Sequence, residues 1–463
     1  MTTSYAAYAA LASETYTLYG GHLSVLPLLL AFGAAALVLL WNLFYALCKD
    51  MLWVGKIRAV TELVRLLLQC KQHGRKTSSE AGKKWSYADE WEGIVDKGGD
   101  VIQFVCADDD RSVSRLGLDF FANRIANWGT GELGLKQKDT VALMMLNRPD
   151  LVAVWLGMAK IGVSTALINT NVTGAALLYS ITLAVQTSTC KVLLLDSELE
   201  TELAADIKAL RAAGCTVLLW DELEGVLQNV SDSRPSRALR CDILESDALL
   251  YIYTSGTTGL PKAGKISHTR YLFSSFLMPT FCYLQSGQSV YCCLPLYHSA
   301  GGMMGAGGCL RSGATMVLKR KFSVRTFSAD ILKYQCSSVQ YIGELCSYLV
   351  NAPPNPLDAS LQLGFAFGNG LRPDIWTKFQ CRYKVRRVVE FYSATEGNVS
   401  LFNTTGRVGA LGFIPPRLAD LLYPVKLLRV DPEDKSKPLR ESGTKSGKGE
   451  CRMAAYEEVG LAA

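Results

Sequence analysis

The stretch Tyr251–His268 reads YIYTSGTTGLPKAGKISH, and its pattern governs the choice of fold. An apolar run ends abruptly in Ser, Thr and Gly, and a Pro-Lys pair follows. These small residues are also common in ordinary solvated turns. Directly after an apolar strand, however, they let successive backbone N–H groups approach an anion, and a lysine adds positive charge. The pattern favours a loop that binds a polyphosphate.

The segment Gly259–Lys265 nearly matches the G-x-x-x-x-G-K motif of P-loop proteins. That motif continues with Ser or Thr, whose hydroxyl binds magnesium. Here Ile266 holds the position, and Pro261 lies inside the motif. We therefore expect a phosphate loop of another class.

Composition excludes several classes of function. The chain has 463 residues, which suits two or three domains, and a net charge of +6. It has no basic stripe interleaved with aromatic residues and no zinc-type spacing, so we expect no nucleic-acid partner. The 14 cysteines include no C-x-x-C pair, which indicates reduced thiols in a cytosol-facing protein and no structural metal.

The N-terminal region is dominated by Leu23–Cys48, which contains no charged residue and is long enough to cross a bilayer. A signal peptide would begin with basic residues, but residues 1–22 have no Lys or Arg. A buried core helix would rarely lack a polar face over this length. Seven basic residues between Lys49 and Lys76 follow the span. The positive-inside rule therefore predicts a single-pass protein with a short non-cytosolic N-terminus and a cytosolic main body.

The juxtamembrane segment, residues 49–99, begins with a predicted helix over Leu52–Leu68. Trp41, Tyr45 and Trp53 stand where an interfacial aromatic belt would lie. In the predicted helix, apolar residues recur at helical spacing with basic residues between them. This pattern is typical of a helix lying in the membrane interface, and packing against a protein core is the alternative.

Beyond residue 100, short apolar runs alternate with helical segments such as Leu151–Ile161 and Glu198–Ala212. This alternation predicts an α/β fold with parallel sheets covered by helices, and ligands then bind beyond the carboxyl ends of the strands. The predicted strands are Thr140–Leu146, Val163–Ile168, Val192–Leu195, Val217–Trp220, Tyr251–Thr254, Val290–Leu294, Thr315–Leu318, Ser338–Ile342, Leu363–Phe367 and Val388–Phe391.

Two further clusters follow predicted strands. FAFGNG at 365–370 reads as a strand ending in a glycine turn, and EFYSATEGN at 390–398 as a strand running into a polar turn. Tyr392 offers a flat face for a nucleobase, Thr395 a hydroxyl for a phosphate, and Glu396 a carboxylate for magnesium. The alternatives are ordinary strand packing for Tyr392 and a surface loop acid for Glu396.

The glycine stretch YIYTSGTTGLPK resembles the phosphate loop of the adenylate-forming, or AMP-binding, enzymes. A narrower resemblance to fatty acid transport proteins, also called very long-chain acyl-CoA synthetases, covers residues 100–440 and implies the large N-terminal lobe of that fold. It rests on VWLGMAKIG at Val154–Gly162, ALINTN at Ala166–Asn171, GNGLRPDIWTKF at Gly368–Phe379 and EFYSATEGNVSLFN at Glu390–Asn403.

The resemblance implies roles for individual residues. Tyr392 is expected to stack on the adenine, Thr395 to contact the α-phosphate, and Glu396 to bind Mg²⁺. His298, in LPLYHSAG, is expected near the acyl pocket, with a core histidine as the alternative. The residues expected to bind the ATP phosphates are Thr254, Ser255, Gly256, Thr257, Thr258, Gly259 and Lys262, and those expected to line the adenine pocket are Gly368, Asn369 and Gly370.

Two departures from the family pattern bear on activity. Ser393 stands where the family usually has glycine. Family-like sequence ends near Arg440, and residues 441–463 form an atypical tail without the ribose aspartate, hinge and catalytic lysine of the small C-terminal lobe. The resemblance therefore implies weak ATP binding and slow catalysis for this chain.

The implied activity is ligation of a long-chain or very long-chain fatty acid to coenzyme A. ATP and Mg²⁺ first give an acyl-adenylate, and the reaction is coupled to fatty acid uptake. The alternatives are a noncatalytic membrane protein that binds fatty acid or nucleotide and assists transport, and an enzyme acting on another acid class. A bilayer partner is expected. The endoplasmic reticulum or plasma membrane is favoured, and the peroxisome is the alternative. Chain-length preference and homo-oligomerisation stay open.

Overall fold

The computed structural model of the chain describes residues 40, 54–78, 84–186, 191–254, 261–395, 397, 399–412, 414, 427–429 and 460–462. The predicted membrane span lies outside these residues except for Leu40, and so do the loop at 255–260 and Glu396. Within them, no helix combines the length and the apolar character that a bilayer crossing requires.

Six strands form the first sheet, in the order β6-β5-β3-β4-β7-β8. All neighbours are parallel except β7 and β8. Strands β3, β4 and β5 are buried throughout, as expected for strands covered on both faces. The strands are β3 (Thr140–Met144), β4 (Ser164–Leu167), β5 (Val192–Leu195), β6 (Thr216–Leu219), β7 (Ala248–Thr254) and β8 (Lys262–Ser267).

Eight strands form the second sheet, in the order β14-β13-β12-β11-β9-β10-β1-β2. Only its two edge strands, β2 and β14, are antiparallel to their neighbours. Its strands are β1 (Ile102–Cys106), β2 (Ser112–Ser114), β9 (Ser289–Cys292), β10 (Thr315–Leu318), β11 (Ser338–Ile342), β12 (Phe365–Asn369), β13 (Arg387–Ser393) and β14 (Ser400–Asn403). Strands β15 (Leu427–Arg429) and β16 (Gly460–Ala462) pair separately.

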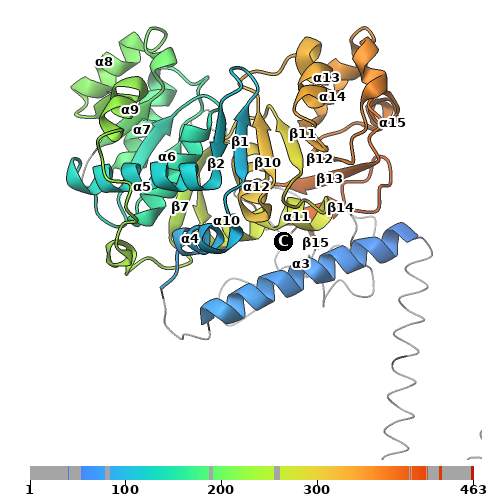
Figure 1. Cartoon of the computed structure of the whole chain (residues 1–463), viewed down its shortest axis with the longest axis horizontal. Helices are drawn as coiled ribbons and strands as arrows, with labels where there is room; N and C mark the ends of the chain where they lie inside the picture. The colour runs from blue at the N-terminus through green and yellow to red at the C-terminus, as the bar shows by residue number, and fades with distance from the viewer. Residues whose placement is uncertain are drawn as a thin grey trace, which may run out of the picture.

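Helices surround both sheets, with α5–α9 gathered about the first and α13–α15 about the second (Figure 1). Helix α6 is buried along its whole length and belongs to one apolar core shared by strands of both sheets. The helices are α3 (Val54–Ser78), α4 (Tyr87–Gly98), α5 (Arg115–Gly131), α6 (Pro149–Lys160), α7 (Gly174–Val185), α8 (Ala204–Ala212), α9 (Trp220–Leu227), α10 (His268–Ser275), α11 (Leu277–Phe281), α12 (Gly307–Ser312), α13 (Val324–Lys333), α14 (Gly343–Asn351) and α15 (Pro373–Arg382).

The predicted α/β fold with parallel sheets is confirmed, and β5, β10 and β11 have the predicted bounds. Strands β1, β2, β8 and β14 were not predicted. Three of these are edge strands, and in β8 the exposed Lys262 and Lys265 give the segment the polarity of a loop. The helix predicted over Glu198–Ala212 is confirmed for Ala204–Ala212, which is α8, and a separate 3₁₀ turn, Ser197–Leu199, precedes it.

Helix α3 extends ten residues beyond the predicted end at Leu68, to Ser78. Its residues Ala59, Leu63 and Leu66 are buried, so this face of the helix packs against the lobe. The alternative of packing against a protein core is therefore confirmed for that face. Leu68 remains half exposed on the opposite side.

A buried cluster of charges joins the helices around α6. The fully buried ammonium group of Lys160 lies 2.8 Å from an Asp119 oxygen and 3.2 Å from a Glu92 oxygen. The guanidinium of Arg240 contacts Glu92 at 2.6 Å and Asp89 at 3.0 Å. Charges removed from water must be paired, so these contacts hold α4, α5 and α6 in one arrangement.

Lys160→Ala should strongly destabilise the protein, because Asp119 and Glu92 stay buried but lose the positive charge of the Lys160 ammonium group. Removing one partner of a buried ion pair typically costs about 3–5 kcal/mol of unfolding free energy. Denaturant unfolding followed by circular dichroism measures the change. Lys333→Ala, which removes an exposed pair with Asp110, is the control and should have little effect. Equal effects of the two variants would contradict this account.

Candidate functional site

The carboxyl ends of the two sheets meet at Asn147, which lies three residues beyond the end of β3. Its side-chain amide donates to the carbonyls of Leu294 at 2.9 Å and Lys319 at 3.3 Å. Its side-chain oxygen accepts a 2.9 Å hydrogen bond from the Leu296 N–H. Because Leu294 follows β9 and Lys319 follows β10, one buried side chain joins loops of both sheets at the edge where α/β proteins bind ligands.

The loop after β9 leads into a glycine-rich π-helix, η4 (Ser299–Ala306). A Cβ atom on Gly301 or Gly302 would overlap backbone carbonyls of the preceding loop, so only glycine permits this close approach. Tyr271 donates to the Gly302 carbonyl at 3.2 Å, and Gln340 donates to a carbonyl in the first turn of η4. The π-helix, a form frequent at functional sites, is therefore held from two sides.

His298 directly precedes η4 and is half buried. Burial lowers the pKa of its imidazole below that of a free histidine, so the ring is neutral at neutral pH. Its ring centroid lies 4.7 Å from that of Tyr297, whose hydroxyl accepts a 3.2 Å hydrogen bond from Asn171. The segment after β4 thus meets the His298 loop.

Thr395 lies in the turn after β13 and joins the two sheets a second time. Its hydroxyl is 3.2 Å from that of Ser299, the first residue of η4. A Cβ atom on Gly264, in β8, would lie only 3.3 Å from the Thr395 methyl group. Arg270 donates to two carbonyls of the same turn, on either side of Thr395. The strand β8 thus has room for Thr395 because residue 264 is glycine.

The turn after β12 is held by the buried carboxyl group of Glu390. Tyr341 donates to one of its oxygens, and the Leu371 N–H donates to the other at 3.0 Å. Burial raises the pKa of Glu390 above its usual value. Gly370 has a positive φ of 79°, and a Cβ on Gly343 would overlap the Gly370 carbonyl. Two glycines and one buried acid therefore shape this turn.

The remaining predicted residues lie at the same edge. Tyr392 is 47% exposed near the end of β13, and Gly368 and Asn369 end the adjacent parallel strand β12. Thr254 and Lys262 are cross-strand partners in β7 and β8, so they flank the segment between them. Lys262 is exposed and Thr254 half buried.

Several predicted residues lie outside the part of the chain that the structure describes, namely Ser255, Gly256, Thr257, Thr258, Gly259 and Glu396. Within the described part, no three His, Cys, Asp or Glu side chains are grouped as metal ligands. The rejected P-loop interpretation is excluded by Lys265, which lies in strand β8 opposite Tyr251 rather than at the start of a helix.

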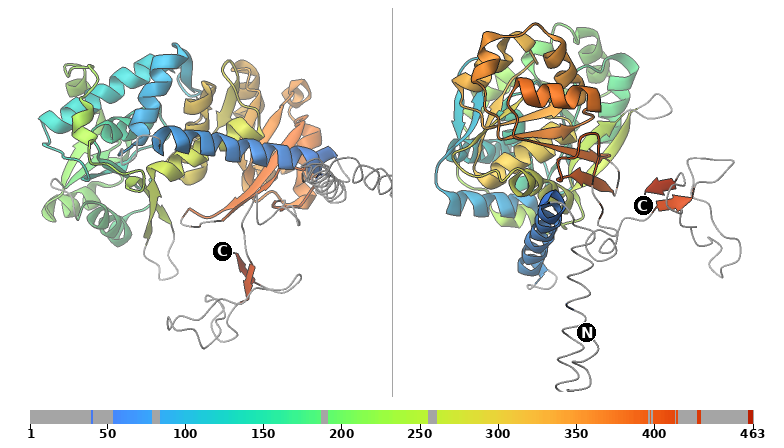
Figure 2. Two further views of the ribbon diagram at one scale, coloured as in Figure 1. Left: turned by 90° about the horizontal axis from the view of Figure 1, so that it is seen from below. Right: turned by 90° about the vertical axis from the view of Figure 1, so that its right-hand side faces the viewer.

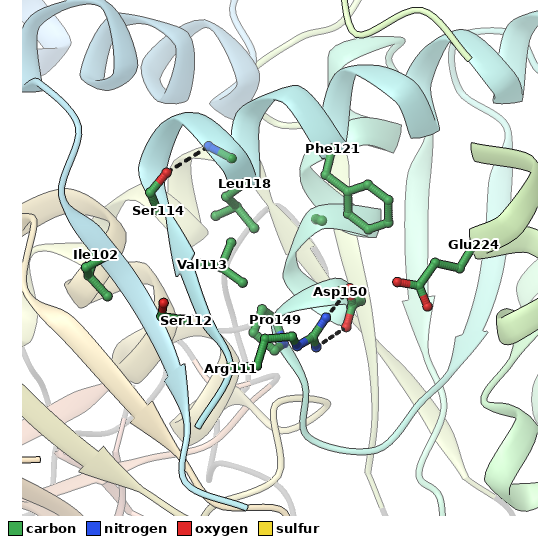
Figure 3. Close-up of a pocket in the computed structure, with 12 residues that line it drawn as sticks. Ile102, Arg111, Ser112, Val113, Ser114, Leu118, Phe121, Pro149, Asp150 and Glu224 are labelled. Atoms are coloured by element: carbon green, nitrogen blue, oxygen red, sulfur yellow. Dashed lines mark hydrogen bonds and ion pairs between the residues drawn. The ribbon is translucent and has the colours of Figure 1, made fainter. Parts of the chain in front are cut away.

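A separate pocket of about 440 Å³ opens between the β1–β2 hairpin, α5, α6 and α9 (Figure 3). Arg111 forms ion-pair contacts with Asp150 at its base, at 2.7 and 3.5 Å, and Glu224 points in from α9. Arg148 also donates to Asp150 at 2.7 Å. Arg111 and Asp150 already pair with each other, and no predicted site residue lines this pocket. We therefore assign the pocket no role in the site.

Sequence reasoning missed four residues that arrange the site, namely Asn147, Arg270, Ser299 and Glu390. Asn147 carries a signal that was available, because it is a polar residue directly after a predicted buried strand. Glu390 and Arg270 act through contacts between segments that are far apart in the chain. Such contacts cannot be predicted from local sequence patterns.

Comparison with known proteins agrees with this geometry. The model of a family described as AMP-binding enzyme matches residues 92–438. The chain belongs to this family. It is 34% identical to long-chain fatty acid transport protein 1 of Bos taurus over 436 residues. That alignment covers 91% of this chain and 63% of the bovine protein, and it confirms the narrower resemblance.

Solved structures share the fold. The inhibitor-bound N-terminal domain of FACL13 from Mycobacterium tuberculosis superposes with a TM-score of 0.61 at 20% identity, covering 71% of this chain and 81% of that domain. ATP-bound MatB from Rhodopseudomonas palustris gives a TM-score of 0.63 at 19% identity, covering 81% and 69% of the two chains. The α/β lobe of adenylate-forming enzymes is therefore confirmed.

Asn147→Ala should destabilise the protein, because it leaves the buried Leu296 N–H and Leu294 carbonyl without this partner. Each buried group left unsatisfied costs about 1–3 kcal/mol. Thermal and denaturant unfolding measure the loss. Asn171→Ala removes hydrogen bonds to Asn169 and Tyr297 that are made by an exposed residue, and it serves as the control. If Asn147→Ala is no less stable than Asn171→Ala, the role of Asn147 in joining the loops is wrong.

Proposed function

We propose that the chain activates a long-chain or very long-chain fatty acid to its acyl-CoA through an acyl-adenylate. The observation that carries the proposal is the contact between Thr395 and Ser299, packed beside Gly264. It brings the turn after β13 against η4, which follows His298, and against the strand that begins at Lys262. Membership of the AMP-binding family and the names of the relatives support the same chemistry.

MgATP is the first substrate in this proposal. Backbone N–H groups of residues 255–259, with Thr254 and Lys262, bind its phosphates, and the Thr395 hydroxyl donates to the α-phosphate. Tyr392 stacks on the adenine beside Gly368, Asn369 and Gly370, a role that its 47% exposure permits. Glu396 holds the Mg²⁺ that accompanies the phosphates.

Two displacements follow. A carboxylate oxygen of the fatty acid attacks the α-phosphorus, pyrophosphate leaves, and the thiolate of coenzyme A then attacks the acyl carbon and releases AMP. The protein positions the reactants and offsets developing negative charge with backbone N–H groups and Lys262. A neutral His298 beside the acyl end provides a hydrogen bond without adding a buried charge.

A second candidate function is noncatalytic binding of fatty acid or nucleotide that assists transport. It is favoured by the relatives' names, which describe transport proteins. In both proposals the chain is attached to the endoplasmic reticulum or plasma membrane through Leu23–Cys48, with the lobe in the cytosol.

Lys262→Ala combined with Thr258→Ala should weaken ATP binding. Loss of a hydrogen bond to a charged group costs about 1.5–3 kcal/mol, or roughly tenfold or more in affinity. Titration calorimetry of the detergent-solubilised chain with MgATP measures this change. Lys265→Ala removes an exposed lysine from the same strand and should leave the affinity unchanged. Unchanged affinity in the double variant would overturn the phosphate-loop assignment.

Incubation with radiolabelled fatty acid, ATP, Mg²⁺ and coenzyme A separates the enzyme from the binding protein. An enzyme forms labelled acyl-CoA and AMP, and Thr395→Val should reduce this product because it removes the hydroxyl assigned to the α-phosphate. Saturable binding of fatty acid with no product in the wild-type chain would favour the noncatalytic candidate instead.

A further inference from the structure

Helix α3 lies along the lower side of the lobe in the view of Figure 1 and crosses its underside in Figure 2. Ala59, Glu62, Leu63 and Leu66 are buried and spaced three to four residues apart, which places them on one side of the helix. This inner face packs against the lobe next to α11.

The inner face is fixed by polar contacts. The two terminal nitrogens of Arg387 donate to the two carboxylate oxygens of Glu62, each at 2.7 Å. Tyr283 donates to the same carboxylate at 2.7 Å, and Thr280 donates to Gln69 at 2.9 Å. A buried bidentate pair has one favourable geometry, so it sets how α3 is rotated about its own axis.

The outer face of α3 carries a second apolar stripe. Val60, Val64, Leu67 and Leu68 follow the spacing i, i+4, i+7, i+8, which again places them on one side of the helix. Leu68 is 51% exposed and Leu67 37% exposed, while the two valines are half buried. Arg58, Thr61 and Arg65 are also exposed, so the uncovered side of the helix combines apolar and basic residues. Adjacent exposed leucines on such a side indicate a partner that accepts apolar side chains.

The charges beside the stripe indicate which partner it is. Arg58 and Arg65 are exposed and lie one heptad apart, next to the outer face. In the sequence, α3 follows the uncharged stretch Leu23–Cys48 after only five residues. Leucines flanked by arginines match the surface of an anionic bilayer, where side chains enter the acyl boundary and guanidinium groups meet lipid phosphates.

We propose that α3 lies between the lobe and an anionic lipid surface, with its outer face against the lipid and its inner face bonded to the lobe. This proposal does not rest on the acyl-CoA chemistry. Arg387, which bonds to Glu62, is the first residue of β13, and Tyr392 follows five residues later. With a rise of about 3.3 Å per residue, the pair lies about 17 Å along the strand from Tyr392. The same strand therefore links the lipid-facing helix to the candidate site.

Photo-cross-linking of the full chain tests the proposal. Leu68→p-benzoylphenylalanine places a photoreactive group on the outer face, and the same replacement at Val226 on α9 is the control. Val226 is also 51% exposed, and α9 lies across the lobe from α3 (Figure 1). The chain is reconstituted into phosphatidylcholine–phosphatidylserine vesicles that contain a radiolabelled phospholipid, and lipid adducts are counted after irradiation.

We expect adducts at position 68 to exceed those at position 226 several-fold, and to fall when phosphatidylserine is omitted. Equal adducts at the two positions, or adducts at 68 with a second copy of the chain instead of lipid, would refute the proposal. A bimane label attached at position 68 gives a second measurement, because brominated lipids should quench it more than the same label at position 226. Neither measurement requires catalysis, so each remains decisive if no acyl-CoA is formed.

Discussion

The contact on which the site depends is made by a single buried amide. Two parallel sheets end at the same edge of the molecule, and their last backbone groups would lie buried without partners unless something bonded to them. Asn147 bonds to Leu294, Leu296 and Lys319, and so satisfies donors and acceptors from the loops after β9 and β10. An unsatisfied buried polar group costs more than a typical hydrogen bond gains, so this edge has one stable arrangement. The glycines of η4 follow from it, because they alone fit against the loop that Asn147 holds.

Buried charge orders the elements around this edge. Lys160 with Asp119 and Glu92 joins the helices that meet α6, and Arg387 with Glu62 joins α3 to β13. Both groups of buried charges lie away from the candidate site. Each of them nevertheless fixes a helix or strand that borders the site. Because a buried ion loses its partner only at high cost, such pairs specify one geometry even where they add little net stability. The same logic applies to Glu390, whose buried carboxyl shapes the turn after β12.

Thr395 is the residue for which the family resemblance proposes a role and whose contacts the structure describes. Membership of the AMP-binding family supports the proposed chemistry, and the structure brings Thr395 beside Ser299, against Gly264, in a turn bonded to Arg270. Those contacts come from strands β8 and β13, in different sheets, and from the helices η4 and α10. A small change in the packing of either sheet would therefore change the position of the turn after β13. The proposed lipid contact of α3 acts at the opposite end of that same strand.

The sequence by itself determined the α/β class, the parallel strands and the glycine turn after β12. These features depend on local periodicity and on residues such as Gly370, which lacks a Cβ atom and can therefore adopt a positive φ. Tertiary structure alone decided that β8 and β14 are edge strands. Strand β8 exposes two lysines and β14 has only four residues with Ser and Asn at its ends, so neither has a strand pattern in the sequence. It also decided which face of α3 is buried. Both of its stripes contain apolar residues, and distant residues distinguish them. Arg387 pairs with Glu62 across more than three hundred residues of chain, and Tyr283 donates to the same carboxylate.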